Sequence, residues 1–204
     1  RVRLDQVSDS DLRQLSARSQ SVHDDKGFIH ITTTNDQAKA KNDSKLASID
    51  KESYTFLAIK SGTVNMRDMI AEDRLILKRG AQVMFLANDF EGKYVNGTIG
   101  KVIEIEENKI IVQIENTDAI IDVKQYSWDN EEYFFDPDSR SIKVKFIGSL
   151  KQYPIKLAWS ITVHKSQGLT FDKVIADLNR AFVPGQIYVG LSRCTSLQGL
   201  HLES

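Results

Sequence analysis

Two short segments in the C-terminal part of the sequence carry residue types that could bind a phosphate group. The first combines small hydroxyl side chains with a histidine, a lysine and a glycine, and the second carries a lone arginine. Lysine and arginine supply positive charge, and glycine lets a ligand approach the backbone closely. This combination indicates a site that binds phosphates. The two segments are 157–168 (LAWSITVHKSQG) and 185–193 (GQIYVGLSR).

The first of these segments has an ambiguous periodicity. Between residues 155 and 164, apolar and more polar side chains alternate, which is typical of a strand. Gly168, three residues after Lys165, is typical of the position that follows a helix end. We expect a short strand from Ile155 to about Ala158, then a turn or helix up to Gly168. A half-buried strand whose polar side chains merely face water explains this segment alone equally well.

Taken together, the two segments resemble two motifs of one enzyme family. Residues 158–168 resemble motif V of the Pif/RecD branch of superfamily-one DNA helicases. Residues 188–194 resemble motif VI of the same branch, with Gly190 where alanine is more usual. The linking segment 173–177 and the C-terminal segment 199–202 also match, so the resemblance covers nearly the whole chain. It implies an α/β fold of the P-loop-NTPase type, the second RecA-like motor domain of such a helicase.

The resemblance implies a nucleotide site formed by three residues. Arg193 is the expected catalytic residue, an arginine finger that reaches the γ-phosphate of ATP from a neighbouring domain. Gln167 and Gly168 are expected to face the same nucleotide. Without the family motif, the favoured interpretation of Arg193 is a cation that complements the C-terminal end of a helix dipole.

A second set of residues is expected to contact single-stranded DNA. In motif V the resemblance assigns Thr162, His164 and Lys165 to the strand, where they would donate hydrogen bonds to phosphates. Thr33 and Asn35 lie where an alternating strand gives way to a helix, and ligands bind at such strand ends in α/β domains. The segment 31–35, with Asn42, weakly resembles the start of the second motor domain. An alternative is that Asn35 only caps the helix.

A third segment, 91–101, has only a superficial similarity to a phosphate-binding loop. Such a loop needs Gly-Lys followed by Ser or Thr and then a helix, whereas Gly100-Lys101 is followed by Val102 and a strand pattern. The sequence also has no apolar run that ends in Asp-Glu and could hold Mg²⁺. We therefore expect neither a phosphate loop nor a metal site in this chain.

The resemblance implies an ATP-dependent DNA helicase that moves 5′-to-3′ along single-stranded DNA and uses ATP with Mg²⁺. Hydrolysis depends on a phosphate loop and a Mg²⁺ carboxylate, which this sequence lacks. The chain alone should therefore bind neither cofactor and hydrolyse no ATP. It begins at Arg1 without a methionine, and we interpret it as a piece of a longer protein. Its expected partners are single-stranded DNA and the missing N-terminal RecA-like domain.

Two other functions share these motifs. The chain could be a non-catalytic module, derived from a helicase, that binds nucleic acid or protein. Such a module would be expected to have lost its helicase motifs, and this chain keeps the motif residues Lys165, Gln167, Gly168 and Arg193. It could also be a RecD-like exonuclease subunit, which would differ in partners rather than chemistry. A phosphate loop encoded upstream of Arg1 would favour a motor over a module.

Composition limits the class of protein further. The chain has 204 residues, 41% of them hydrophobic, and a formal net charge of −1. Because there is no overall basic field, any nucleic-acid site must be local. The single cysteine excludes an internal disulfide and suits a reducing compartment, the cytoplasm or, in a eukaryote, the nucleus. No apolar run approaches the length of a membrane span, so we expect no membrane association.

The pattern of expected elements divides the chain into two domains. Residues 1–77 and 154–204 read as α/β, with a helix N-cap near Ser8, a strand at 28–33, a helix capped by Asn35 and Asp36, a strand at 54–59 and a helix at 66–77. Residues 78–153 have short β-branched segments separated by turn residues, which predicts an inserted small all-β barrel. The resemblance implies that this barrel is SH3-like. Its expected strands are 82–87, 97–105, 109–114, 119–123 and 141–146, and 99–105 with 109–114 form the clearest hairpin.

Overall fold

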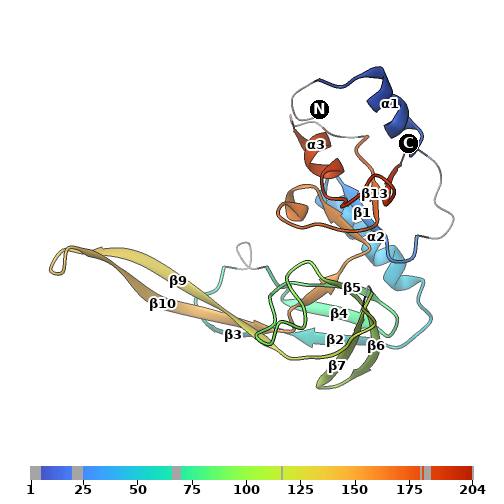
Figure 1. Cartoon of the computed structure of the whole chain (residues 1–204). Helices are drawn as coiled ribbons and strands as arrows, with labels where there is room; N and C mark the ends of the chain where they lie inside the picture. The colour runs from blue at the N-terminus through green and yellow to red at the C-terminus, as the bar shows by residue number, and fades with distance from the viewer. Residues whose placement is uncertain are drawn as a thin grey trace. The chain divides into compact units, whose positions relative to one another are not determined.

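The computed structural model describes residues 6–19, 25–65, 70–115, 117–179, 181 and 185–203. The chain forms two compact units, one made of Arg1–Asp50 and Leu157–Ser204, the other of Lys51–Lys156 (Figure 1). The second unit begins earlier than the expected boundary at residue 78. The reason is that strand β3 (Ile59–Gly62) pairs with β10 (Ser141–Gln152), which brings it into that unit.

A four-stranded parallel sheet forms the centre of the first unit, in the order β12-β1-β13-β14. The two inner strands, β1 (Ile29–Thr32) and β13 (Val174–Ala176), are buried along their whole length. Parallel strands covered on both faces have this pattern. The outer strands are β12 (Ser160–Thr162) and β14 (Leu200–Leu202). The expected α/β class and the strand near 28–33 are confirmed.

The helices of the first unit are fixed by their caps. Helix α1 (Asp9–Ser16) begins at a capping box in which Ser8 and Asp11 satisfy each other's backbone N–H groups. Helix α2 (Asn35–Ala47) begins after Thr34, whose hydroxyl accepts a hydrogen bond from the Gln37 N–H. Asn35 is therefore the first helical residue, and the expectation that Asn35 caps the helix is wrong. A third helix, α3 (Gln186–Leu191), precedes Arg193.

The region 155–168 contains two strands rather than one. Strand β11 (Ile155–Leu157) matches the expected short strand and extends the sheet of the second unit. The next residues form β12, although a turn or helix was expected there. They form a strand because all three of its residues are buried in the parallel sheet. A short 3-10 helix, η2 (His164–Ser166), follows, and Gly168 closes it with φ +78°, the left-handed conformation that suits glycine.

The regular elements described in the second unit are strands. Strands β5 (Gln82–Phe85), β6 (Ile99–Glu106), β7 (Lys109–Ile114) and β8 (Ile120–Val123) confirm the expected pattern, including the hairpin of β6 and β7. With β11 they make a five-stranded sheet, and β3, β10 and β9 (Tyr126–Asp136) make a three-stranded one. Closure into an SH3-like barrel remains a prediction.

The helix expected at 66–77 is wrong where the structure describes it. Residues 66–69 lie outside the described part, and Arg74–Lys78 form strand β4, which pairs with β2 (Ser53–Leu57). The physical reason is the side-chain alternation of β4. Leu75 and Leu77 are fully buried, whereas Arg74, Ile76 and Lys78, which alternate with them, are not, and this period of two fits a strand.

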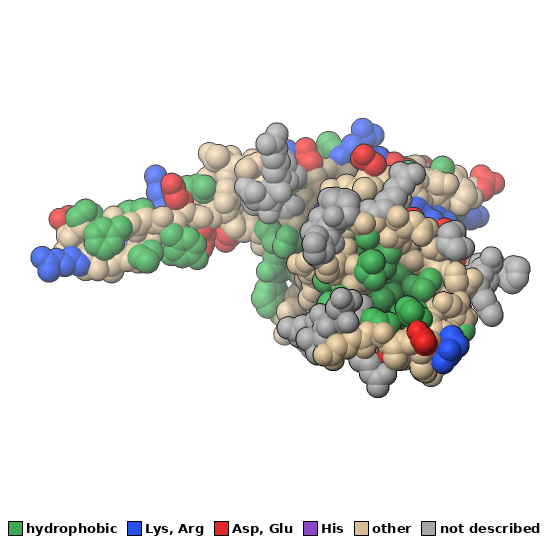
Figure 2. Space-filling view, turned by 90° about the horizontal axis from the view of Figure 1, so that it is seen from above, with side chains coloured by type: hydrophobic (Ala, Val, Ile, Leu, Met, Phe, Trp, Pro, Cys, Tyr) green, Lys and Arg blue, Asp and Glu red, His purple; other side chains and the backbone are tan. Residues whose placement is uncertain are grey.

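Strands β9 and β10 extend together as a long two-stranded ribbon (Figure 1). Its register places five apolar residues on one face, and each is at least half exposed. Figure 2 shows such hydrophobic side chains among charged ones along this arm. Sequence reasoning missed β9 because its exposed apolar and charged residues give no core-facing alternation. The five residues are Tyr133, Phe135, Ile142, Val144 and Phe146.

Among the described residues, no helix combines the length and the apolar character needed to cross a bilayer.

Candidate functional site

The residues expected to contact DNA come together at the carboxyl ends of the strands of the parallel sheet. Strands β1 and β12 are neighbours, and their register pairs Thr32 with Thr162. The chain segments that leave these two strands therefore start side by side, joined by the hydrogen bond from the Val163 N–H to the Thr32 carbonyl at 2.9 Å. Both segments leave from the carboxyl ends of parallel strands, where α/β folds bind ligands.

These residues divide into exposed side chains and buried ones. His164, Lys165 and Asn35 are exposed. Thr162 is buried, and its hydroxyl oxygen accepts a hydrogen bond from the Lys165 N–H at 3.4 Å. Thr33 is also buried and donates its hydroxyl to Gln37 Oε1 at 3.2 Å. In this structure the exposed side chains can meet a ligand, whereas Thr162 holds the backbone of Lys165 and Thr33 holds the side chain of Gln37.

The guanidinium of Arg193 lies against the loop that contains Gln167 and Gly168. Its Nη1 atom donates to the carbonyl oxygens of Leu169 at 2.9 Å and Ser166 at 3.3 Å, the residues on either side of that pair. Gln167 and Gly168 are exposed, and a Cβ added to Gly168 would meet nothing within 4 Å. The structure therefore brings together all three residues expected at the nucleotide.

Arg193 also caps the end of helix α3. Its Nε atom donates to the Val189 carbonyl at 3.0 Å, and Nη2 donates to the Ser192 hydroxyl at 2.9 Å. The alternative interpretation of a cation at a helix C-terminus is thus realised in this structure. The two interpretations are compatible, because the same half-buried side chain reaches both the helix and the loop. To bind a phosphate it would exchange carbonyl partners for phosphate oxygens.

The other motif VI residues have packing roles. Gly190 lies inside α3, and a Cβ there would be 2.9 Å from the Leu178 Cδ2 atom. This close contact explains why glycine fits at a position where alanine is more usual. Cys194 is half-buried and donates its thiol to the Asp172 carbonyl at 3.5 Å. Burial raises the pKa of the Cys194 thiol, so it stays protonated and inert at neutral pH.

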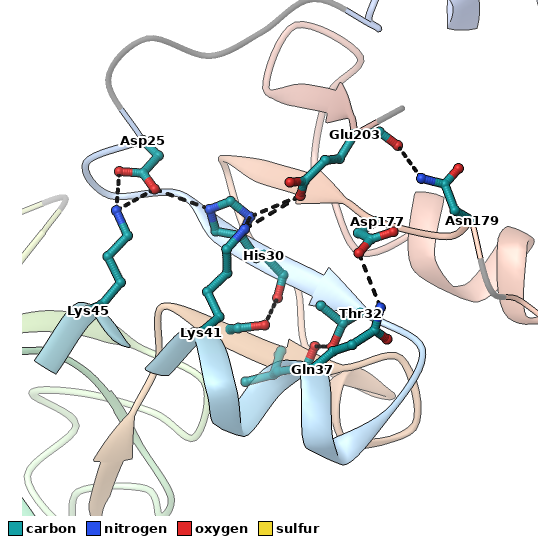
Figure 3. A network of polar contacts seen from close by, with 11 residues as sticks. Asp25, His30, Thr32, Gln37, Lys41, Lys45, Asp177, Asn179 and Glu203 are labelled. Atoms are coloured by element: carbon teal, nitrogen blue, oxygen red, sulfur yellow. Dashed lines mark hydrogen bonds and ion pairs between the residues drawn. The ribbon is translucent and has the colours of Figure 1, made fainter. Parts of the chain in front are cut away.

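A polar network that sequence reasoning missed ties β1 to α2 and to the C-terminal segment (Figure 3). His30 on β1 is buried, and its Nε2 lies 3.3 Å from Asp25 while its Nδ1 lies 2.6 Å from Lys41 Nζ and 3.5 Å from Glu203. Lysine can only donate, so Nδ1 accepts and the proton of a neutral imidazole sits on Nε2. The only signal in the sequence was a polar residue within an apolar strand.

This network makes the stability of the first unit depend on pH. Burial and the charge of Lys41 lower the pKa of His30, although Asp25 and Glu203 oppose them. The folded pKa is below the unfolded one, so the stabilisation is present above about pH 6.5 and is lost as pH falls towards the folded pKa. We expect the free energy of unfolding to fall between pH 7.5 and 5, by at most about 1.4 kcal/mol per pH unit from this group.

Chemical denaturation across this pH range checks the expectation. His30→Gln should flatten the dependence, whereas His164→Gln, at an exposed position, should leave it unchanged. An unchanged slope in His30→Gln would contradict the assignment.

A second missed contact joins α2 to the strand end of β13. Gln37 accepts the hydroxyl of Thr34 at 2.9 Å, and its Nε2 donates to Asp177 at 3.4 Å (Figure 3). Asp177 directly follows β13, so these groups lie at the carboxyl end of the sheet, together with the residues that follow β1 and β12. An aspartate immediately after an apolar strand was the signal available in the sequence.

The comparisons with known proteins point to one family, although no family model matches the chain. ATP-dependent DNA helicase Pif1 from Bdellovibrio bacteriovorus is 37% identical over 171 aligned positions, and the match covers 81% of this chain and 36% of that protein. The same helicase from Xenopus laevis is 32% identical over 211 aligned positions, gaps included, and the match covers 98% of this chain and 32% of that protein. The solved structure of unliganded Pif1 from Bacteroides sp. matches the whole chain with a TM-score of 0.90 and 35% identity, and 47% of that structure is covered.

The chain belongs to the Pif1 helicase family. This confirms the resemblance to superfamily-one helicases and the RecA-like α/β fold. Its Pif1 relatives are ATP-dependent DNA helicases, and other solved structures of the Bacteroides protein hold single-stranded DNA or ADP-AlF4. The chain spans about a third of the length of the curated Pif1 relatives named above.

Proposed function

We propose that this chain is the second motor domain, with its inserted all-β unit, of an ATP-dependent helicase that moves 5′-to-3′ on single-stranded DNA. The observation that carries the proposal is the pair of hydrogen bonds from Arg193 to the carbonyls of Ser166 and Leu169. They join motif VI to the motif V loop, which also carries the expected DNA contacts His164 and Lys165. The longer protein to which the chain would belong is called the full-length helicase below.

The nucleotide side of the site has the chemistry of a phosphate contact. Arg193 offers a guanidinium and Gln167 an amide, and Gly168 leaves its backbone open to approach. Among the described residues no group of three or more His, Cys, Asp or Glu side chains could hold a metal. In our proposal Mg²⁺ and the phosphate loop belong to the N-terminal RecA-like domain, because the sequence of this chain has no phosphate loop, and this chain alone does not hydrolyse ATP.

The role of Arg193 follows from charge. In phosphoryl transfer, negative charge is spread over the oxygens of the transferring group, and an arginine supplied from a neighbouring domain stabilises it. The guanidinium would leave its carbonyl partners when ATP closes the cleft. Because those partners lie on the motif V loop, the exchange would also move His164 and Lys165 relative to DNA. This is how hydrolysis would be coupled to a step along the strand.

The DNA side offers donors for a phosphate backbone. Lys165 and His164 are exposed beside the end of β1, and Asn35 is exposed at the start of α2. Such contacts grip a strand independently of its sequence. A helicase-derived binding module or a RecD-like exonuclease subunit would use the same surface. The relatives named above are Pif1 helicases, which favours the motor.

The experiment that tests this proposal is the removal of one cation. Lys165→Ala in the full-length helicase should weaken binding to oligo(dT) about tenfold, because a hydrogen bond to a charged group is worth about 1.5 kcal/mol. The slope of log K against log salt should also fall by about one. Fluorescence anisotropy over a salt series measures both.

Lys109 provides a matched control, because it is a lysine in the second unit that is paired with Glu104 at 2.7 Å. Lys109→Ala should leave both quantities unchanged. Parental affinity and salt slope in Lys165→Ala, as in Lys109→Ala, would mean that Lys165 does not contact DNA.

A further inference from the structure

Strand β12 has an unpaired side that is buried. It lies at the edge of the parallel sheet, next to β1 only. The His30 N–H donates to the Trp159 carbonyl at 2.8 Å, so in a parallel ladder residues 159 and 161 face β1. The backbone N–H and C=O of Ser160 therefore point away from β1. Ser160 is only 1% exposed, so water cannot satisfy these two groups.

The side chain of Asn42 takes the place of the missing strand. Its Nδ2 atom donates to the Ser160 carbonyl at 2.9 Å, and its Oδ1 atom accepts from the Ser160 N–H at 2.9 Å. One amide group thus makes the two hydrogen bonds that a neighbouring residue in a ladder would make. Asn42 lies on α2, so these bonds also fasten the helix to the strand.

We call the pair of hydrogen bonds between Asn42 and Ser160 the clamp. Strand β12, which the clamp holds, leads directly into the loop that carries the proposed ligand contacts. Two residues after Ser160, the Thr162 hydroxyl accepts from the Lys165 N–H, and η2 begins at His164. The position of Lys165 is therefore set by where β12 is held. We propose that Asn42 is a positioning residue, whose amide fixes the edge of β12 and thereby places Lys165 for its phosphate contact. This inference rests on the proposed function of Lys165.

The chemistry explains why asparagine is required at this position. The site needs a donor and an acceptor on one short planar group. Aspartate offers two acceptors, so one of its oxygens would face the Ser160 carbonyl, and alanine leaves both buried groups unsatisfied. Glutamine keeps the amide but adds a methylene. Asn42→Asp should therefore be more harmful than its size suggests, and Asn42→Gln should recover part of the function.

The decisive experiment is a double-mutant cycle on oligo(dT) binding by the full-length helicase. Asn42→Ala should weaken binding about threefold to tenfold and lower the salt slope. If Asn42 acts through Lys165, Asn42→Ala combined with Lys165→Ala should bind no more weakly than Lys165→Ala alone.

Ser44→Ala, at an exposed position on the same helix, is the control and should bind like the parent. A fully additive double variant, or an Asn42→Ala variant with parental affinity, would overturn the proposal.

Hydrogen exchange separates this inference from the proposed function. In Asn42→Ala the amides of residues 160–165 should exchange about tenfold faster, with Ser44→Ala unchanged, and where alanine prevents folding Asn42→Gln should show a smaller increase at the same amides. Unchanged exchange would overturn the clamp whatever the DNA results are. If Lys165→Ala binds DNA like the parent while exchange at 160–165 rises, the DNA role of Lys165 is wrong. The clamp itself is then supported.

Discussion

Arg193→Ala in the full-length helicase is expected to slow DNA-stimulated ATP hydrolysis by about three powers of ten. The reason is that an arginine supplied to the transferring phosphoryl group is worth about 10³ to 10⁵ in rate in related enzymes. Binding to single-stranded DNA should stay within about twofold of the parent, because His164 and Lys165 are untouched. Single-turnover hydrolysis and oligo(dT) anisotropy measure the two quantities separately.

The control for this variant must address the structural bonds of Arg193. The side chain holds carbonyls of Val189, Ser166 and Leu169, so its loss could also loosen the loop. Ser192→Ala removes a fourth contact of Arg193, the Ser192 hydroxyl that accepts from Nη2, and leaves the guanidinium in place. It should keep hydrolysis near the parental rate. A parental rate of ATP hydrolysis by a folded Arg193→Ala protein would show that Arg193 is not the arginine finger.

Gly199→Ala is expected to lower the free energy of unfolding of the chain by about 3 kcal/mol, because overpacking against backbone cannot be relieved by a rotamer change. A Cβ at Gly199 would lie 1.8 Å from the carbonyl oxygen of Asp172, and 3.2 Å from Cys194 Sγ. The same residue accepts the Val174 N–H at 2.9 Å, so the chain cannot simply move away. Urea denaturation followed by circular dichroism measures the change.

Gly92→Ala separates crowding from the general cost of replacing glycine. A Cβ there would meet nothing within 4 Å, although its φ of +74° is left-handed. It should cost only about 1 kcal/mol. Equal losses in the two variants would mean that the close approach at Gly199 is not what destabilises the chain.

Much of the architecture was predictable because the signals were local. Ser8 begins α1 as expected, β1 and α2 follow each other as expected, and β6 and β7 form the hairpin that their turn residues indicated. The family was predicted from the resemblance of two segments to motifs V and VI, and the relatives confirm the family. These features depend on neighbours in sequence, so one sequence contains them.

The features that were missed depend on residues far apart in the chain. The clamp joins Asn42 to Ser160, and the buried network joins His30 to Glu203. Neither pairing leaves a periodic or compositional trace, because the partners meet only when the sheet is assembled. The ribbon of β9 and β10 was half missed for another reason, since its apolar side chains face outwards and break the expected alternation.

The residues of the expected nucleotide site lie close together in the structure, and their contact with a nucleotide remains a prediction. Motif resemblance placed Gln167, Gly168 and Arg193 together, and the structure brings them into one loop contact. It could not predict that Thr33 and Thr162 would be buried, because burial depends on how β1 and β12 pair. Their proposed contact with DNA therefore needs their hydroxyls to become accessible when DNA binds.

The most direct test of the account is a structure of the full-length helicase with ADP and aluminium fluoride, which mimics the transferring phosphoryl group. The measured quantity is the distance from the Arg193 guanidinium to the fluoride atoms. We expect at least one nitrogen at about 3 Å, the distance of a hydrogen bond. A guanidinium that remains on the carbonyls of Ser166 and Leu169, beyond hydrogen-bond distance of the nucleotide, would contradict the account.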